Sequence, residues 1–176
     1  FNLAIAPLIA AIAAGNCAVI KCSKESKYTS NLIKEIINNT FDKNYVYCVE
    51  PDIDYNDMLS QRYDYIFFTG SSRVGKIIMN VASKNLTPVS LELGGKCPCI
   101  VDESANIRVA AKRIVWGKLL NAGQTCVSVD YVAVHNGVKE KLIKCILKEI
   151  KSRYHDALNS NTYPRIINEH HCFVNY

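Results

Sequence analysis

The sequence predicts an α/β protein built on a doubly wound parallel sheet. In the first half of the chain, short segments rich in Val, Ile, Phe and Tyr alternate with longer segments of helical periodicity. Strands that alternate with helices in this way are typical of βαβ units, whose strands run parallel. Polar, glycine-containing turns also follow the apolar strands. Right-handed crossovers bring the carboxyl ends of such strands to one edge of the sheet, where α/β proteins bind ligands.

The elements of the first half follow from periodicity. Helices are expected at residues 3–14, 26–39, 55–61 and 74–84, and strands at 17–21, 45–49 and 65–69. The apolar residues of two helices are expected to face inward: Leu32, Ile33, Ile36 and Ile37 in one, and Ile77, Ile78 and Val81 in the other.

The first 20 residues carry no charge, which is compatible with a membrane-spanning helix. Pro7, Gly15 and Asn16 interrupt this run. A buried helix, a glycine C-cap and a buried strand explain it better.

After Pro88 the pattern changes. Strands are expected at residues 89–93, 99–101 and 131–134, and helices at 107–120 and 139–154. Leu142, Ile143, Ile146, Leu147 and Ile150 of the last helix are expected to face inward, and its lysines to face solvent. We place a domain boundary at Gly94-Gly95, which divides the chain into residues 1–93 and 94–176.

Composition narrows the class of protein. The net charge of +5 comes from Lys and Arg scattered along helical faces, so no nucleic-acid partner is expected. Several of the eight cysteines stand in apolar runs without a disulfide rhythm, and no signal peptide is present, which indicates a cytoplasmic, reducing environment. Cys97-Pro98-Cys99 is a candidate metal or redox pair, but its spacing is not C-x-x-C and no paired His follows at zinc distance, so no metal is expected. His170-His171 is interpreted as a solvated tail.

A glycine-bounded loop follows the strand at 65–69: Gly70-Ser71-Ser72-Arg73-Val74-Gly75. Gly70 lets the chain leave the strand tightly, and the serines can cap the next helix. Free N–H groups at a helix N-terminus favour a phosphate. The loop is neither G-x-G-x-x-G nor a P-loop, and a plain strand-to-helix turn is the alternative.

Two further residues suggest covalent chemistry. Cys126 follows the small, polar run Asn121-Ala122-Gly123-Gln124-Thr125, which leaves a nucleophilic thiolate open to approach. Glu92 stands between two leucines, where a carboxylate kept from water is a better general base. The alternatives are a buried structural cysteine and a glutamate that only makes hydrogen bonds.

Loop, carboxylate and cysteine in this order resemble the aldehyde dehydrogenase superfamily, and the segments are most similar to its class 3 branch, which acts on fatty and aromatic aldehydes. Gly70 to Gly75 is similar to the family's G-S-T-x-x-G, Leu91 to Lys96 matches L-E-L-G-G-K, and Gly123 to Cys126 matches G-Q-x-C. The resemblance implies a Rossmann-type cofactor part at 1–93 and the start of a catalytic domain at 94–176.

The resemblance also implies roles for residues. Cys126 would attack the aldehyde, and Glu92 would activate the water that hydrolyses the thioester. NAD or NADP would be bound by Lys21, Ser23, Lys24, Gly70, Ser71, Ser72, Arg73, Val74 and Gly75. The family reads Lys-Pro-Ser-Glu where this chain has Lys21-Cys22-Ser23-Lys24. Because a carboxylate repels a 2′-phosphate and an ammonium attracts it, Lys24 favours NADP.

Other expectations concern the parent protein. The chain begins at Phe1 and lacks the family's second Glu motif, so we expect a fragment of a longer protein. Its parent would be a homodimer acting on an aldehyde as its small-molecule substrate. It would be cytoplasmic or attached to the endoplasmic reticulum by an anchor outside this chain. The alternative function is a catalytically silent, nucleotide-binding or dimerisation remnant.

Overall fold

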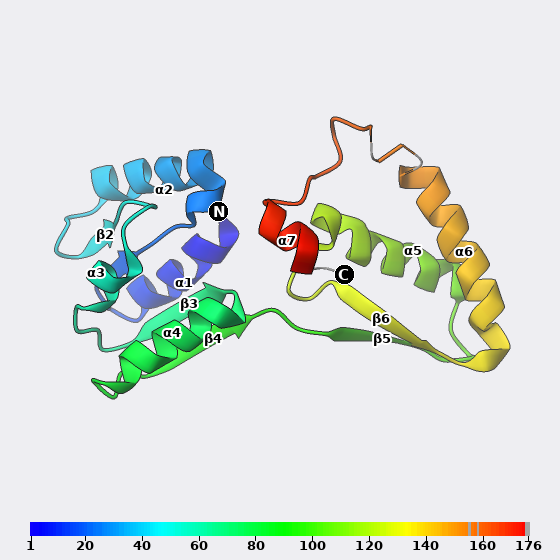
Figure 1. Cartoon of the computed structure of the whole chain (residues 1–176), viewed down its shortest axis with the longest axis horizontal. Coiled ribbons are helices and arrows are strands. Elements are labelled where there is room, and N and C mark those ends of the chain that lie inside the picture. Colours follow the sequence, from blue (N-terminus) through cyan, green and yellow to red (C-terminus); the bar gives the residue numbers. More distant parts are fainter. Residues whose placement is uncertain (155, 158, 175–176) are drawn as a thin grey trace. The chain divides into compact units, whose positions relative to one another are not determined.

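The computed structural model describes residues 1–154, 156–157 and 159–174. The chain divides into two compact units, Phe1–Leu93 and Gly94–Tyr176. Among the described residues the strands form parallel two-stranded pairs, β1–β2, β3–β4 and β5–β6 (Figure 1). The predicted α/β class with parallel strands is confirmed.

The first part of the N-terminal unit, built around the β1–β2 pair, contains α1 (Asn2–Ala13), β1 (Ala18–Ile20), α2 (Lys27–Thr40) and β2 (Val46–Cys48). The 3₁₀ turn η1 (Lys24–Ser26) precedes α2. Gly15 ends α1 with a φ of 78°, and the N–H groups of Gly15 and Asn16 bond the carbonyls of Ile12 and Ala11. This Schellman arrangement is the C-cap that the sequence predicted.

The core of this part of the unit is formed by the buried residues Leu8, Cys22, Ile33, Ile37, Val46 and Cys48. Leu32 and Ile36 are 53% and 48% exposed, so the prediction that all four apolar residues of this helix face inward is wrong for these two. A helix on a two-stranded pair buries only a narrow stripe, and residues on its flank stay in solvent.

The second part of this unit, built around the β3–β4 pair, contains the short helix α3 (Tyr55–Leu59), β3 (Ile66–Gly70), α4 (Ser72–Ser83) and β4 (Val89–Leu93). Strands β3 and β4 pair in register from Ile66 with Val89 to Gly70 with Leu93. Gly75 lets α4 approach β4 closely, since a Cβ there would lie 3.0 Å from Leu93 Cδ2. Ile78 is buried, but Ile77 is 42% exposed, contrary to prediction.

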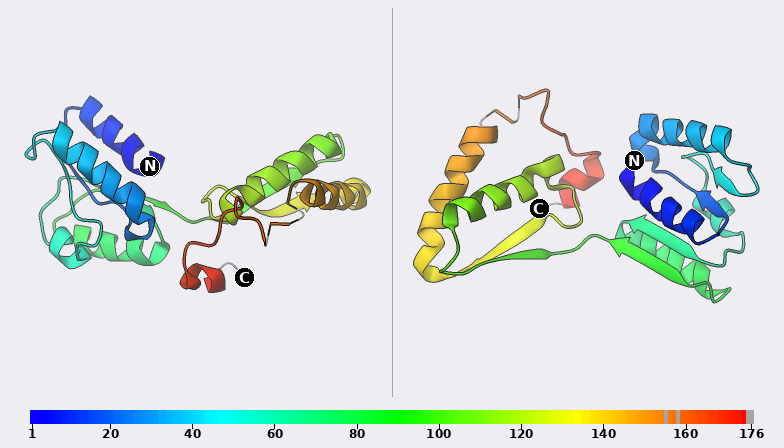
Figure 2. Two further views of the ribbon diagram at one scale, coloured as in Figure 1. Left: turned by 90° about the horizontal axis from the view of Figure 1, so that it is seen from above. Right: turned by 180° about the vertical axis from the view of Figure 1, so that it is seen from behind.

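The C-terminal unit contains β5 (Cys97–Val101), α5 (Ile107–Leu119), the 3₁₀ turn η2 (Leu120–Gly123), β6 (Val129–Val134), α6 (Asn136–Tyr154) and α7 (Glu169–Val174). Helix α5 lies along the β5–β6 pair and contacts α6 (Figure 2). The core contains Val101, Ile107, Ala111, Ile114 and Leu142. Of the inward face predicted for α6, Ile143 and Leu147 are exposed instead.

Two predictions about the chain's ends are also decided. Residues 1–20 form α1, a turn and β1, but of these two elements only Leu8 is buried, so the prediction of a buried helix and a buried strand is wrong within this unit. No helix in the part of the chain described here is long and apolar enough to cross a membrane. His171 is not in a solvated tail. It belongs to α7, is half-buried, and its N–H donates to Asn168 Oδ1 at 3.0 Å.

Candidate active site

Cys126 lies on a turn with an unusual backbone between α5 and β6. Asn121, Ala122 and Gly123 have φ values of 53°, 55° and 78°, three successive left-handed residues. Glycine suits position 123, where a Cβ would also lie 3.2 Å from the Lys118 carbonyl oxygen. The turn leaves Cys126 exposed. Within the C-terminal unit, Cys126 is therefore not a buried structural cysteine, which was the alternative interpretation.

Gln124 holds this turn in place. Its Nε2 donates to the carbonyls of Asn121 at 3.0 Å and Arg165 at 3.1 Å, and its Oε1 accepts from the Ile167 N–H at 2.9 Å. One side chain therefore joins the cysteine turn to a segment more than 40 residues later in the chain. Tyr163 adds a hydrogen bond from its hydroxyl to the Leu119 carbonyl at 3.1 Å.

Sequence reasoning missed the role of Gln124. The signal available was its place directly before Thr125 and Cys126 in a motif. Its partners could not be inferred, because the segment at 165–167 shows no periodicity that would place it beside the turn.

Cys97, at the start of β5, also contacts the turn. Its thiol donates to the Cys126 carbonyl oxygen at 3.3 Å. From the sequence, Cys97 was a candidate only as half of a metal or redox pair with Cys99. Among the described residues no group of three or more His, Cys, Asp or Glu could hold a metal ion.

Glu92 lies on β4 and is exposed. Leu91 and Leu93 face Gly75 of α4, and the alternation of a strand turns Glu92 to the opposite face. The predicted exclusion of Glu92 from water is therefore wrong within this unit, because flanking leucines on a strand bury the other face of the sheet. Glu92 and Cys126 belong to different units, and their cooperation remains a prediction.

The glycine loop forms a strand-to-helix turn. Ser71 is the N-cap of α4, and its Oγ accepts from the Val74 N–H at 3.4 Å. Ser71, Ser72 and Arg73 are exposed, Val74 is half-buried and Gly75 is buried. A Cβ at Gly70 would lie 2.5 Å from the tip of the Phe68 ring, so any other residue there would require this ring to move. The exposed first turn of α4 suits an anion.

Lys21 and Lys24 follow the carboxyl end of β1. Lys21 Nζ donates to the Pro51 carbonyl at 2.9 Å and lies 4.5 Å from the centre of the Tyr55 ring. Burial, and then the charge of Lys24, lower the pKa of Lys21. Lys24 is exposed, and Ser23 caps η1 by accepting from the Glu25 N–H at 3.2 Å. The two ammonium groups make this strand end electropositive.

Comparison with known proteins shows which family this chain belongs to. A sequence profile described as the aldehyde dehydrogenase family matches residues 1–170. The 4,4'-diaponeurosporen-aldehyde dehydrogenase of Staphylococcus aureus is 50% identical over 173 residues, which cover 97% of this chain and 38% of that protein. The dimeric, NADP-preferring aldehyde dehydrogenase of Rattus norvegicus is 42% identical with the same coverage. This chain belongs to the aldehyde dehydrogenase family.

Solved structures agree with this aldehyde dehydrogenase assignment. The substrate-bound state of Staphylococcus aureus AldH superposes with a TM-score of 0.87 at 49% identity, covering 96% of this chain and 37% of that one. An NAD-dependent aldehyde dehydrogenase from Sinorhizobium meliloti gives 0.75 at 30% identity, covering 89% of this chain and 32% of that one. This aldehyde dehydrogenase chain therefore spans about 38% of the curated relatives named above.

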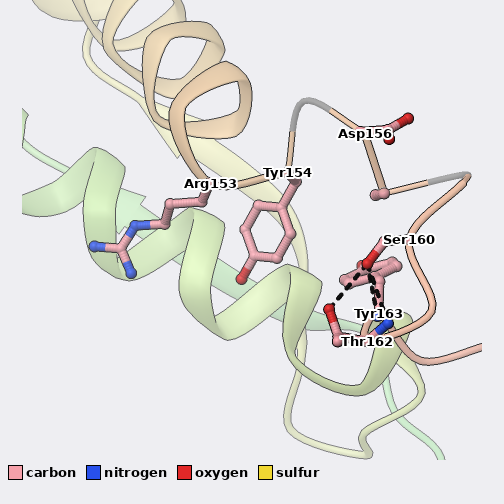
Figure 3. Close-up of a pocket in the computed structure, with 7 residues that line it drawn as sticks. Arg153, Tyr154, Asp156, Ser160, Thr162 and Tyr163 are labelled. Carbon is pink, nitrogen blue, oxygen red and sulfur yellow. Dashed lines mark hydrogen bonds between the residues drawn. The ribbon is translucent and has the colours of Figure 1, made fainter.

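A cavity of about 380 Å³ lies elsewhere in this aldehyde dehydrogenase chain, at the end of α6 (Figure 3). It is lined by Arg153, Tyr154, Asp156, Ala157, Ser160, Thr162 and Tyr163. The hydroxyl groups of Ser160 and Thr162 form a hydrogen bond of 2.9 Å. None of the predicted catalytic or cofactor residues lines this cavity, so it is separate from the candidate active site.

Proposed function

We propose that this chain carries the nucleophile and the general base of an NAD(P)-dependent oxidoreductase that converts an aldehyde to a carboxylic acid. The observation that carries the proposal is the exposed thiol of Cys126 on a turn fixed by Gln124, within a chain of this family. A thiol nucleophile needs an open approach from solvent and a stable backbone beneath it.

In the proposed reaction the Cys126 thiolate attacks the aldehyde carbonyl carbon and forms a hemithioacetal. The Cys126 backbone N–H stabilises the oxyanion. The cofactor, when bound, accepts the hydride that leaves this carbon. A thioester on Cys126 remains. Glu92 then takes a proton from water, which attacks the thioester, releases the carboxylic acid and restores the thiol.

The residues of the N-terminal unit fit an anionic cofactor. The exposed first turn of α4, from Ser71 to Arg73, offers N–H groups and a helix dipole to a phosphate. Lys21 and Ser23 would bind a ribose hydroxyl, as the family resemblance implies. We therefore assign residues 1–93 as part of an NAD(P)-binding domain and residues 94–176 as part of a catalytic domain.

The exposed Lys24, beside Lys21, supports binding of NADP. Lys24→Glu is expected to weaken binding of 2′-AMP by roughly tenfold in calorimetric titration while leaving 5′-AMP within twofold, since a carboxylate repels the extra phosphate. Glu25→Gln, one residue away on η1, is the matched control. In the full-length parent, a strong kcat/KM preference for NAD that Lys24→Glu leaves unchanged would refute NADP use.

Properties of the whole protein follow as proposals. We infer a homodimeric parent that acts on a small-molecule substrate, an aldehyde, in the cytoplasm or at the endoplasmic reticulum, without a nucleic-acid partner. The rat relative is named dimeric and NADP-preferring, which supports the dimer and the cofactor.

The test is aldehyde-dependent reduction of NAD(P), followed by absorbance. Cys126→Ser is expected to lower the rate by roughly a thousandfold, because the hydroxyl is a far weaker nucleophile. Cys172→Ser removes another exposed thiol and is expected to leave the rate unchanged. Equal rates in the two variants would contradict the role of Cys126. No reduction by the wild-type chain would favour the catalytically silent remnant.

A further inference from the structure

Two thiols meet at the carbonyl group of Cys126. The Cys97 Sγ donates to this oxygen at 3.3 Å, and the Cys126 Sγ is attached to the same carbonyl carbon through its own Cα and Cβ. Gly95 lies beside them without a side chain: a Cβ there would be 3.8 Å from both the Cys126 oxygen and the Cys97 sulfur. Rotation about the Cα–Cβ bond of the exposed Cys126 is the movement that would bring its thiol to Cys97.

The two cysteines differ in access to solvent. Cys126 is exposed and Cys97 is half-buried, so a small oxidant reaches Cys126 first. The strand around Cys97 is also irregular, because the β5–β6 register shifts between Cys97 and Pro98. Cys99, two residues further along β5, packs instead against the core of the unit. Cys99 therefore serves as a comparison for Cys97, because it is a thiol on the same strand that packs against the core instead of the Cys126 turn.

We infer that Cys97 is a resolving thiol for Cys126, so that hydrogen peroxide converts the pair to a reversible intramolecular disulfide. In the first step the Cys126 thiolate attacks one peroxide oxygen, breaks the O–O bond and becomes a sulfenic acid, while hydroxide leaves. In the second step the Cys97 sulfur attacks the Cys126 sulfur, the S–O bond breaks, and water leaves with the Cys97 proton.

The consequence is protection of Cys126. A sulfenic acid without a nearby thiol is oxidised further to sulfinic acid, which ordinary thiols do not reduce, whereas a disulfide is restored by dithiothreitol. The disulfide would also block the atom that we propose as the nucleophile. The inference concerns only the oxidation of Cys126, and its readouts do not depend on catalysis.

The experiment uses the 176-residue chain treated with hydrogen peroxide, alkylated under denaturing acidic conditions and digested with trypsin without reduction. Cys97 and Cys99 then share the peptide 97–108, and Cys126 lies in the peptide 119–139. The linked pair of peptides is expected in the wild type and in Cys99→Ser. In Cys97→Ser its yield is expected to fall at least about tenfold, and Cys126 sulfinic acid to accumulate instead.

A linked product that persists in Cys97→Ser would overturn the inference, as would equal sulfinic acid in the wild type and in Cys97→Ser. If Cys97→Ser does not fold, the wild type alone decides the matter. The free thiols of Cys97 and Cys126 must disappear together as peroxide is added while Cys99 stays alkylatable. Loss of Cys126 alone would contradict the inference.

Discussion

At the scale of single residues, Gln124 makes three of the hydrogen bonds that hold the cysteine turn in its unit. It makes hydrogen bonds to Asn121, Arg165 and Ile167, and two of these partners lie far along the chain. The catalytic thiol that we propose thus depends on an amide that has no part in the reaction.

Gln124→Leu is expected to lower the free energy of unfolding of the C-terminal unit by about 1–3 kcal/mol, because the carbonyl and N–H groups at 165–167 lose their partners. Urea denaturation followed by the fluorescence of Trp116, the single tryptophan, measures this. Amide exchange at Ile167 is expected to accelerate. Gln61→Leu is the control, since Gln61 Nε2 donates to the hydroxyl of the neighbouring residue, Ser60, at 3.4 Å. Equal stability of the two variants would contradict the role of Gln124.

Residue types and order predicted Cys126 correctly as an exposed thiol, since small, polar neighbours indicate a surface turn. The same reasoning was wrong for the burial of Glu92. The flanking leucines lie on one face of the strand and Glu92 lies on the other, so they do not indicate whether Glu92 is covered. The contact of Cys97 with Cys126 was missed because the register of β5 and β6 cannot be inferred from spacing.

At the scale of elements, the periodic segments were predictable. Helix α5 was expected at residues 107–120 and spans Ile107–Leu119, and β4 has the predicted bounds, Val89–Leu93. The inward faces were predicted too wide, as Leu32, Ile77 and Leu147 show by their exposure. Helix α7 was missed, because a six-residue helix has too few turns to display a period.

The left-handed turn between α5 and β6 provides an element-scale prediction. Gly123→Ala is expected to destabilise the C-terminal unit by about 1–2 kcal/mol, since alanine is strained at a φ of 78° and its Cβ would crowd the Lys118 carbonyl.

Gly94→Ala is the matched control, because no atom of the described residues lies within 4 Å of a Cβ at that position. Urea denaturation gives the stability, and maleimide labelling reports whether the Cys126 turn has moved. A Gly123→Ala chain as stable as Gly94→Ala, with unchanged labelling of Cys126, would show that the left-handed turn is not required.

At the scale of the whole molecule, the chain consists of two compact units that divide between Leu93 and Gly94. The residues that we propose to bind the cofactor belong with Glu92 to the first unit, and Cys126 belongs to the second. The proposed chemistry therefore requires both units, and no property of either one alone tests it.

The most direct test of this central claim is mass spectrometry of the acylated chain during turnover of an aldehyde with NAD(P). In Glu92→Gln, a thioester on Cys126 is expected to accumulate, because its hydrolysis slows by about a hundredfold or more without the general base. In the wild type the thioester is expected to stay scarce, and Cys126→Ser is expected to carry none. A thioester that hydrolyses equally fast in Glu92→Gln and the wild type, or an acyl group on a cysteine other than Cys126, would contradict the account.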